Sequence, residues 1–215
     1  MFQLYVFDMD GTLVDSRRDL ANATNALLVE CGAAPLPDDR IGRMVGDGAA
    51  TLVARAFEAA GVERPADALS RFLTIYSAHL LDHTRPYPGI VETLGALRAR
   101  ASLAVLTNKP LASTREILES LDLARHFDRA AIVGGDGPFP RKPDPAGLRH
   151  LMARVGADAE STLLVGDSVI DWKTARAARA RICLARYGFG FEGFPLEELS
   201  SDVRIVDSPT EIGVL

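Results

Sequence analysis

From residue 90 to residue 185, helix-like stretches alternate with short apolar stretches, and this alternation limits the fold more than any other feature. Apolar residues recur at helical spacing in the first kind of stretch, whereas the second kind is rich in Val, Ile and Leu. Helices are expected over residues 90–100, 111–121, 145–155 and 171–180, and strands over residues 102–106, 130–133, 162–165 and 181–185. Because strands that alternate with helices form parallel sheets, we expect an α/β fold with a doubly wound parallel, Rossmann-like sheet.

The first strand is expected at residues 3–8, and it is separated from the others by a long helical block. Between this strand and residue 83, apolar residues recur only at helical spacing, and Gly32 and Gly61 stand where two of the helices would end. The sequence therefore predicts that a small all-helical cap domain is inserted after the first strand.

The predicted domain boundaries follow from this insertion. An α/β core would comprise residues 1–15 and 84–215, and the helical cap would comprise residues 16–83, with linkers near Asp15 and near Arg85. Residues 203–206 are expected to add an edge strand to the core. We expect Asp15 and Ser16 to act as a helix N-cap and hinge.

The composition excludes several classes of protein. With 47% hydrophobic and 25% charged residues, the 215-residue chain can bury a sizeable core. The net charge of −5 and the scattered Arg residues give no indication of nucleic-acid binding. The two cysteines, Cys31 and Cys183, lack metal-site spacing and are expected to be reduced thiols. No apolar run is long enough for a membrane helix, so we expect a cytoplasmic protein without a membrane partner.

Polar residues come directly after four of the predicted strands. The clusters are Asp8 and Asp10, then Thr107, Asn108 and Lys109, then Lys142, and finally Gly166, Asp167, Ser168 and Asp171. In a parallel sheet the carboxyl ends of the strands meet at one edge, where ligands bind. A single Asp after a strand is weak evidence, because a helix cap needs the same residue. Four clusters at one edge instead predict a functional site.

The residue types in these clusters suit phosphoryl transfer. Asp8 and Asp10 would repel each other unless a cation lay near them, which predicts a hard divalent metal, and Asp167 would complete its site. A carboxylate can attack a phosphoryl group, while a second carboxylate protonates the leaving oxygen and later activates water. Lys142 would hold the phosphoryl group and screen the charge of the nucleophile. Thr107 and Asn108 would donate hydrogen bonds to the phosphoryl group.

The four clusters resemble the four motifs of the haloacid dehalogenase superfamily of phosphatases, in the same order. The matching segments are DMDGTLVDS, LTNKP, RKPDP and VGDSVID. The first and the last are highly specific, and the middle two support the resemblance by their position. The segments GDGAATLVARAF, YPGIVETLGALRA, LAVLTNKP and YGFG are most similar to the phosphoglycolate phosphatases of this superfamily. The resemblance covers essentially the whole chain.

The resemblance implies a role for each site residue. Asp8 would be the nucleophile that forms an aspartyl-phosphate intermediate, and Asp10 the general acid and base. The metal, by resemblance Mg²⁺, would be bound by the Asp8 side chain, the Asp10 backbone carbonyl and Asp167. Asp171 is included in this metal group, where it would orient a metal-bound water or Lys142. The core residues expected to contact the substrate are Thr107, Asn108, Lys109 and Lys142.

The resemblance also implies the reaction. Dehalogenases of the superfamily lack a carboxylate two residues after the nucleophile, and its ion-pumping ATPases have Thr there, so Asp10 favours hydrolysis of a phosphate ester. The expected substrate is 2-phosphoglycolate, a small phosphorylated metabolite. In the cap, Arg43 and the turn Gly46-Asp47-Gly48 suit its carboxylate, although the turn could equally be a simple connection between helices.

Other interpretations remain open from the sequence. The chain could be a phosphatase for sugar phosphates, pyrophosphate or nucleotides, a phosphomutase, or a non-catalytic phosphate-binding module. Lys109 could contact the substrate or lie in an exposed loop. The oligomeric state is open, and a homodimer is one alternative. Relatives often have Gly near the end of the helix after the fourth motif, where this chain has Ala178-Arg179-Ala180, so we expect a different helix end there.

Overall fold

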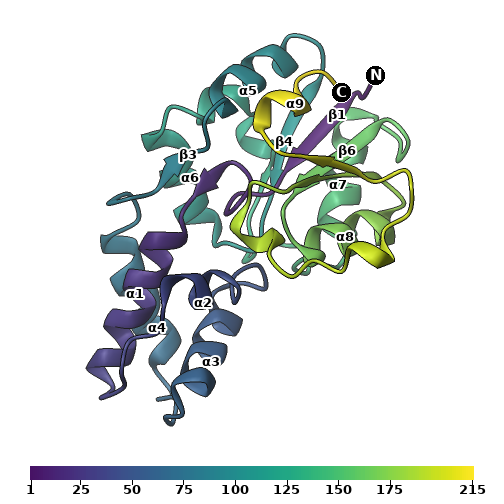
Figure 1. The fold of residues 1–215 in the computed structure, drawn as a ribbon. Coiled ribbons are helices and arrows are strands. Elements are labelled where there is room, and N and C mark those ends of the chain that lie inside the picture. Colours follow the sequence, from purple (N-terminus) through teal and green to yellow (C-terminus); the bar gives the residue numbers. More distant parts are fainter.

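The computed structural model describes all 215 residues and contains a six-stranded parallel sheet in the order β5-β4-β1-β6-β7-β8 (Figure 1). The strands are β1 (Leu4–Phe7), β4 (Ser102–Leu106), β5 (Ile132–Val133), β6 (Thr162–Gly166), β7 (Arg181–Ala185) and β8 (Arg204–Val206). The predicted α/β fold with a doubly wound parallel sheet is confirmed. Because β1 lies between β4 and β6, the loops after these three strands are neighbours.

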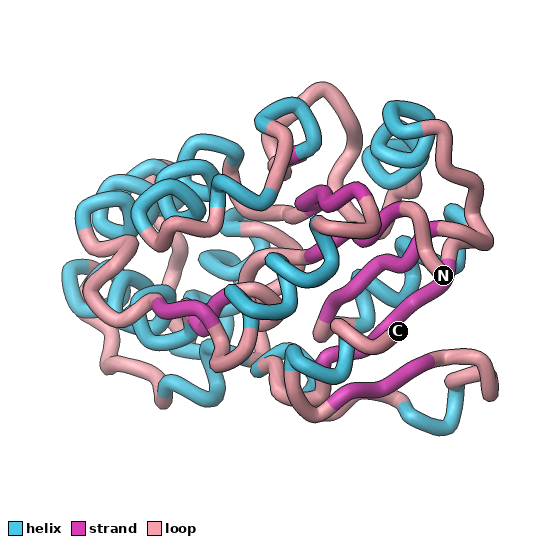
Figure 2. The backbone as a smooth tube through the Cα atoms, turned by 90° about the horizontal axis from the view of Figure 1, so that it is seen from above, coloured by secondary structure: helices cyan, strands magenta, loops and turns pink.

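Helices cover both faces of this sheet, as the view from above also shows (Figure 2). The core helices are α5 (Ile90–Arg98), α6 (Leu111–Ser120), α7 (Ala146–Val155), α8 (Val169–Ala178) and α9 (Pro209–Ile212). In β1, Tyr5 and Phe7 pack into one hydrophobic cluster, and Leu4 and Val6 pack into a second one on the opposite face. This two-sided burial explains why the first strand is apolar throughout rather than alternating.

Most predicted element boundaries agree with the structure within two residues, but the strand expected at residues 130–133 is shorter. Residues Arg129–Ala131 form the 3₁₀ turn η2, which leaves only Ile132 and Val133 in β5. The side chain of Asp128 accepts a hydrogen bond from the Ala130 N–H at 2.9 Å and so stabilises the turn. The other short 3₁₀ segments are η1 (Ala124–His126), η3 (Phe189–Phe191) and η4 (Leu196–Glu198).

The helical block between the first strand and residue 83 contains α1 (Arg17–Glu30), α2 (Asp38–Gly42), α3 (Ala49–Ala60) and α4 (Ala68–Ala78). These helices lie together at the lower left of Figure 1, where α1 packs against α2 and α4. In α1, Leu20, Ala23 and Leu27 recur at helical spacing and are buried. None of the helices in the chain combines the length and apolar character that crossing a bilayer demands.

Where the chain enters and leaves the helical block, it forms a small antiparallel pair that the sequence did not indicate. Strand β2 (Val14–Asp15) pairs with β3 (Arg85–Pro86) at the positions where simple linkers were expected. Two-residue strands are too short to show an alternating pattern, so this pair could not be found from periodicity. Nearby, the carboxylate of Asp19 in α1 accepts hydrogen bonds from the backbone N–H groups of His83 and Thr84. The two crossings are thereby held side by side.

The C-terminus of α8 corrects one expectation. Without Gly, this helix was expected to end differently, yet Arg179 adopts the left-handed conformation with φ of 62°. The N–H of Ala180 donates to the carbonyl of Ala175 at 2.9 Å, which is the bond that a left-handed helix end provides. The gain from these capping bonds and from packing therefore outweighs the cost of placing a side chain in this region.

Candidate active site

The four polar clusters meet at the carboxyl edge of the sheet, as the sequence predicted. Asp8 directly follows β1, Thr107 follows β4, and Asp167 follows β6. Lys142 lies in the loop after β5, and its Nζ atom is 2.8 Å from Oδ1 of Asp8. Loops from four separate strands therefore contribute to one site, as expected for residues placed just after the strands of a parallel sheet.

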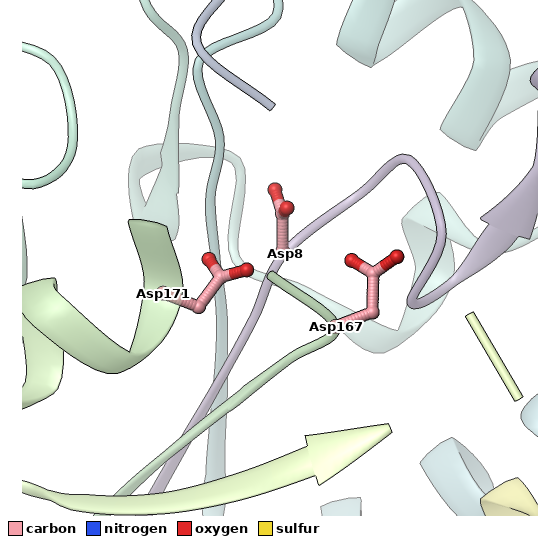
Figure 3. A group of neighbouring side chains, drawn as sticks. All are labelled: Asp8, Asp167 and Asp171. Atoms are coloured by element: carbon pink, nitrogen blue, oxygen red, sulfur yellow. The ribbon is translucent and has the colours of Figure 1, made fainter. Parts of the chain in front are cut away.

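Three buried carboxylates form the acidic centre of this site. Figure 3 shows Asp8, Asp167 and Asp171 converging from three segments, and oxygen atoms of the three groups lie within 4.8 Å of one another. Burial raises the pKa of Asp8 to about 6, with Lys142 opposing the shift and Asp171 adding to it. Burial, followed by the charges of Asp171 and Asp8, also raises the pKa of Asp167 well above its ordinary value. The centre therefore has an excess of negative charge.

This excess charge fits a hard divalent cation. The donors are all oxygen atoms, and the one cation that pairs with the group, Lys142, contacts Asp8 and Asp171 but not Asp167. Asp167 is fixed by hydrogen bonds from the Gly190 N–H at 2.7 Å and the Thr12 hydroxyl at 3.3 Å. A Cβ atom on Gly11 would lie 1.9 Å from Oδ2 of Asp167, so only glycine allows the chain to pass so close. The side chains of Asp8 and Asp167 could hold such a cation.

Asp171 has two tasks that occupy its carboxylate. Its Oδ1 atom accepts from Lys142 Nζ at 2.6 Å, and its Oδ2 atom accepts from the backbone and hydroxyl of Ser168 in a capping box at the start of α8. Burial would lower the pKa of Lys142, but its ion pairs with Asp171 and Asp8 outweigh burial and raise it. Asp171 was expected to orient either a metal-bound water or Lys142. Its contact with Lys142 Nζ agrees with the second role.

Asp10 lies outside the acidic centre, and its charge is balanced separately. Lys109 Nζ is 3.0 Å from its Oδ1 atom, and the Ser16 hydroxyl donates to the same oxygen at 2.5 Å. Ser16 stands at the N-cap position of α1, as expected, but its side chain makes no capping hydrogen bond. The two acids of the first motif thus have different partners, and nothing in the sequence signalled that Ser16 is one of them.

Thr107, Asn108 and Lys109, which follow β4, are all buried, but their side chains differ in whether they are free to contact a ligand. Thr107 lines the cavity beside Asp8. Both side-chain N–H groups of Asn108 are engaged, because they donate to the carbonyls of Gly46 at 2.9 Å and Lys142 at 3.0 Å. The expected donation from the Asn108 side chain to a phosphoryl group is therefore not available in this arrangement; its amide instead joins the helical block to the Lys142 loop.

Lys109 is not an exposed loop residue, so that alternative is wrong. Its side chain is 3% exposed and lies between Asp10 and the hydroxyl of Tyr76 in α4, to which its Nζ donates at 2.5 Å. Burial would lower the pKa of Lys109, but Asp10 and Tyr76 outweigh this effect and raise it. Nothing in the sequence singles out Tyr76, because it lies far along the chain from every motif.

A cavity opens between this edge of the sheet and the helical block. It is lined by Asp8, Asp10, Leu20, Val45, Gly46, Gly48, Ala49, Leu52, Phe72, Leu73, Tyr76, Thr107, Asn108, Lys109 and Pro110. The wall formed by the helical block is mainly apolar, and Lys109 is the single cation among the lining residues. Gly48 and Ala49 bring the N-terminus of α3 to the cavity, where free backbone N–H groups favour an anion.

Arg43, which was expected to contact the substrate, does not line this cavity. Its guanidinium pairs with Glu192 at 2.8 Å and with Asp39 at 3.1 Å, and its side chain is 42% exposed. The reason is local: Arg43 follows the short helix α2, whose end faces the C-terminal loop of the core rather than the acidic centre.

The chain is similar over most of its length to known proteins. The pattern of the haloacid dehalogenase-like hydrolases matches residues 5–185. The phosphoglycolate phosphatase of Rhodospirillum rubrum is 45% identical over 196 residues, which cover 87% of this chain and 80% of the relative. That of Agrobacterium fabrum is 39% identical, with coverage of 95% and 88%. A crystal structure described as a predicted phosphoglycolate phosphatase from Haemophilus somnus has a TM-score of 0.88 at 30% identity, with coverage of 98% and 96%.

Proposed function

Because this chain belongs to the haloacid dehalogenase-like hydrolases and is a phosphatase among them, we propose that it is a magnesium-dependent phosphomonoesterase acting on 2-phosphoglycolate. The products would be glycolate and phosphate. The names of the most similar relatives support the choice of substrate. The single observation that carries the proposed chemistry is that Asp8 and Asp10 border one cavity but have separate cationic partners, Lys142 and Lys109.

This separation supports two distinct tasks for the two acids. Asp8 lies beside Lys142, so its carboxylate oxygen can attack phosphorus while the ammonium group balances the charge of the phosphoryl oxygens. The bond between phosphorus and the ester oxygen then breaks, and Asp10 transfers its proton to that oxygen. The result is an aspartyl phosphate on Asp8 and a free alcohol.

The second half of the reaction uses the same acids. Asp10, now a carboxylate, accepts a proton from a water molecule, and the oxygen of that water attacks phosphorus and displaces Asp8. Phosphate leaves and Asp10 is protonated again. Thr107, which lines the cavity together with Asp8, would donate a hydrogen bond to the phosphoryl group in both halves of the reaction.

The proposed cofactor is Mg²⁺, held by the side chains of Asp8 and Asp167 and by the backbone carbonyl of Asp10. It would supply positive charge to the phosphoryl oxygens during transfer. The buried carboxylates and their raised pKa values support this assignment, since an uncompensated acidic centre is costly without a cation.

The helical block, residues 16–83, would act as the cap that selects the substrate, with residues 1–15 and 84–215 as the catalytic core. A carboxylate-bearing substrate is supported by the N-terminus of α3, which opens onto the cavity at Gly48 and Ala49. The helical block contributes few polar groups to the cavity, so it could bind few polar groups of a substrate. This favours a small substrate.

The test is the initial rate of phosphate release from a panel of phosphate esters with Mg²⁺ present. We expect 2-phosphoglycolate to have the highest kcat/KM, and Asp8→Asn to abolish turnover because an amide cannot form the intermediate. Lys173→Met, an exposed change on α8, serves as the control and should behave like the wild type. A panel led by sugar phosphates, pyrophosphate or nucleotides would overturn the substrate, and no turnover on any ester would overturn the reaction.

A further inference from the structure

A buried chain of polar contacts links Asp10 to the helical block. Lys109 Nζ lies 3.0 Å and 3.2 Å from the two carboxylate oxygens of Asp10 and 2.5 Å from the hydroxyl of Tyr76. The Lys109 side chain is 3% exposed and that of Asp10 is 12% exposed, so water competes little for these bonds. Charged hydrogen bonds of this kind orient their partners strongly when they are shielded from solvent.

The contacts make the two oxygens of Asp10 unequal. Oδ1 accepts from both Ser16 at 2.5 Å and Lys109 at 3.0 Å, whereas Oδ2 accepts only the longer bond from Lys109 at 3.2 Å. An oxygen that already accepts two hydrogen bonds is a poor site for a proton, so Oδ2 is the atom that would carry and transfer one. Ser16 and Lys109 therefore determine which oxygen of Asp10 is used.

Tyr76 is itself held rigidly on the side of the helical block. It belongs to α4, it is 3% exposed, and its ring stacks on Phe72 at a centroid distance of 5.7 Å with an interplanar angle of 11°. Lys109 Nζ also lies 4.5 Å from the centroid of the Tyr76 ring. The position of the lysine thus depends on a residue that only the helical block can supply.

We propose that Lys109 and Tyr76 are positioning residues for Asp10, and that the docked helical block aligns the acid through the Tyr76 hydroxyl. Without that hydroxyl, Lys109 would keep its ion pair with Asp10 but lose the contact that fixes its direction. Asp10 would remain in the site, and proton transfer from Oδ2 to the leaving oxygen would become less efficient. This inference rests on the proposed function, since it assigns a partner to the acid of that reaction.

The test compares two leaving groups. Tyr76→Phe removes only the hydroxyl and keeps the ring that packs on Phe72. An alkoxide such as that of 2-phosphoglycolate needs a proton as it leaves, whereas 4-nitrophenolate leaves without much help. We expect kcat/KM of the variant to fall by about tenfold for 2-phosphoglycolate and by less than about twofold for 4-nitrophenyl phosphate. The tenfold fall is smaller than the full contribution of a general acid, because Asp10 itself remains.

A double-mutant cycle distinguishes positioning from a general effect on structure. In an Asp10→Asn background there is no acid left to position, so adding Tyr76→Phe should not lower kcat/KM for 2-phosphoglycolate any further. The matched control is Tyr5→Phe, which removes a buried hydroxyl that has no hydrogen-bond partner and lies in β1 away from the cavity. It should leave both substrates unchanged.

The outcomes separate this inference from the proposed function. Suppose that the wild type hydrolyses 2-phosphoglycolate. The positioning role is wrong if Tyr76→Phe lowers kcat/KM equally for both esters, or leaves kcat/KM unchanged for both. It is also wrong if Tyr76→Phe lowers the rate by the same factor with and without Asp10. If the wild type hydrolyses neither ester, the proposed function itself fails.

Discussion

Asp8 and Asp10 are two residues apart in the sequence, yet the structure places them in different electrostatic surroundings. Asp8 joins Asp167 and Asp171 in a buried centre, whereas Asp10 forms an ion pair with Lys109. Sequence reasoning could name both acids because they come just after a buried strand. It also expected Lys142 and Asp167 beside Asp8, but it did not assign Ser16 and Lys109 to Asp10, because such side-chain contacts depend on the fold.

The raised pKa of Asp8 leads to a prediction about the metal-free protein. Its carboxyl has a pKa of about 6 in the folded state, against an ordinary value of 3.8. Between these two pH values the folded state binds more protons than the unfolded state, so the free energy of unfolding falls as the pH rises through this window. Asp8 is expected to lower the free energy of unfolding by about 3 kcal/mol at most.

This loss can be measured by urea unfolding with a chelator present, at pH values across that window, in the wild type and in Asp8→Asn. The variant lacks the ionisable group and should show a smaller decline. If Mg²⁺ binds the folded state as proposed, its addition should restore the stability of the wild type above the window. Equal pH dependence in the two proteins would contradict the shift at Asp8.

At the scale of single elements, the apolar periodicity located the long helices and strands well but missed features stabilised by local hydrogen bonds. The short strands β2 and β3 have no repeat to detect, and the turn Arg129–Ala131 depends on the side chain of Asp128. The end of α8 is a further case, since Arg179 adopts a conformation that glycine favours.

Arg179→Gly is expected to stabilise the protein by about 1 kcal/mol, because the exposed residue would no longer place a Cβ atom in the left-handed region. The midpoint of thermal or urea unfolding reports this change. Gly156→Ala is the matched comparison, since Gly156 ends α7 with φ of 71° and has no neighbouring atom within 4 Å of its Cβ position. That change should cost about 1 kcal/mol. A destabilised Arg179→Gly protein would refute the idea that this helix end is strained.

At the scale of the whole molecule, three of the polar contacts between the helical block and the core differ in how far they are shielded from solvent. Asn108 donates to the Gly46 carbonyl, Lys109 donates to Tyr76, and Arg43 pairs with Glu192. The first two contacts are largely shielded from solvent, whereas Arg43 and Glu192 are 42% and 61% exposed. An exposed ion pair contributes about 1 kcal/mol or less, so these contacts differ in weight.

Arg43→Ala should therefore change kcat and KM for 2-phosphoglycolate by no more than about twofold, since an exposed pair contributes so little. Steady-state kinetics beside Arg40→Ala, a change of an exposed arginine in α2, the helix that Arg43 follows, would provide the comparison. A tenfold rise in KM that is specific to Arg43→Ala would instead restore the sequence-based expectation that this arginine contacts the substrate.

The sequence by itself determined the α/β fold, the family and the polar residues that follow the strands and meet at the site. These depend on local patterns: a buried strand is apolar, and a parallel sheet brings the residues at the carboxyl ends of its strands to one edge. The tertiary structure alone decided that Ser16 and Lys109 contact Asp10, that Tyr76 contacts Lys109, and that Arg43 pairs with Glu192 outside the cavity lining. Such pairings depend on how the helical block packs against the core, and no spacing along the chain encodes the distance between two side chains that approach from different elements.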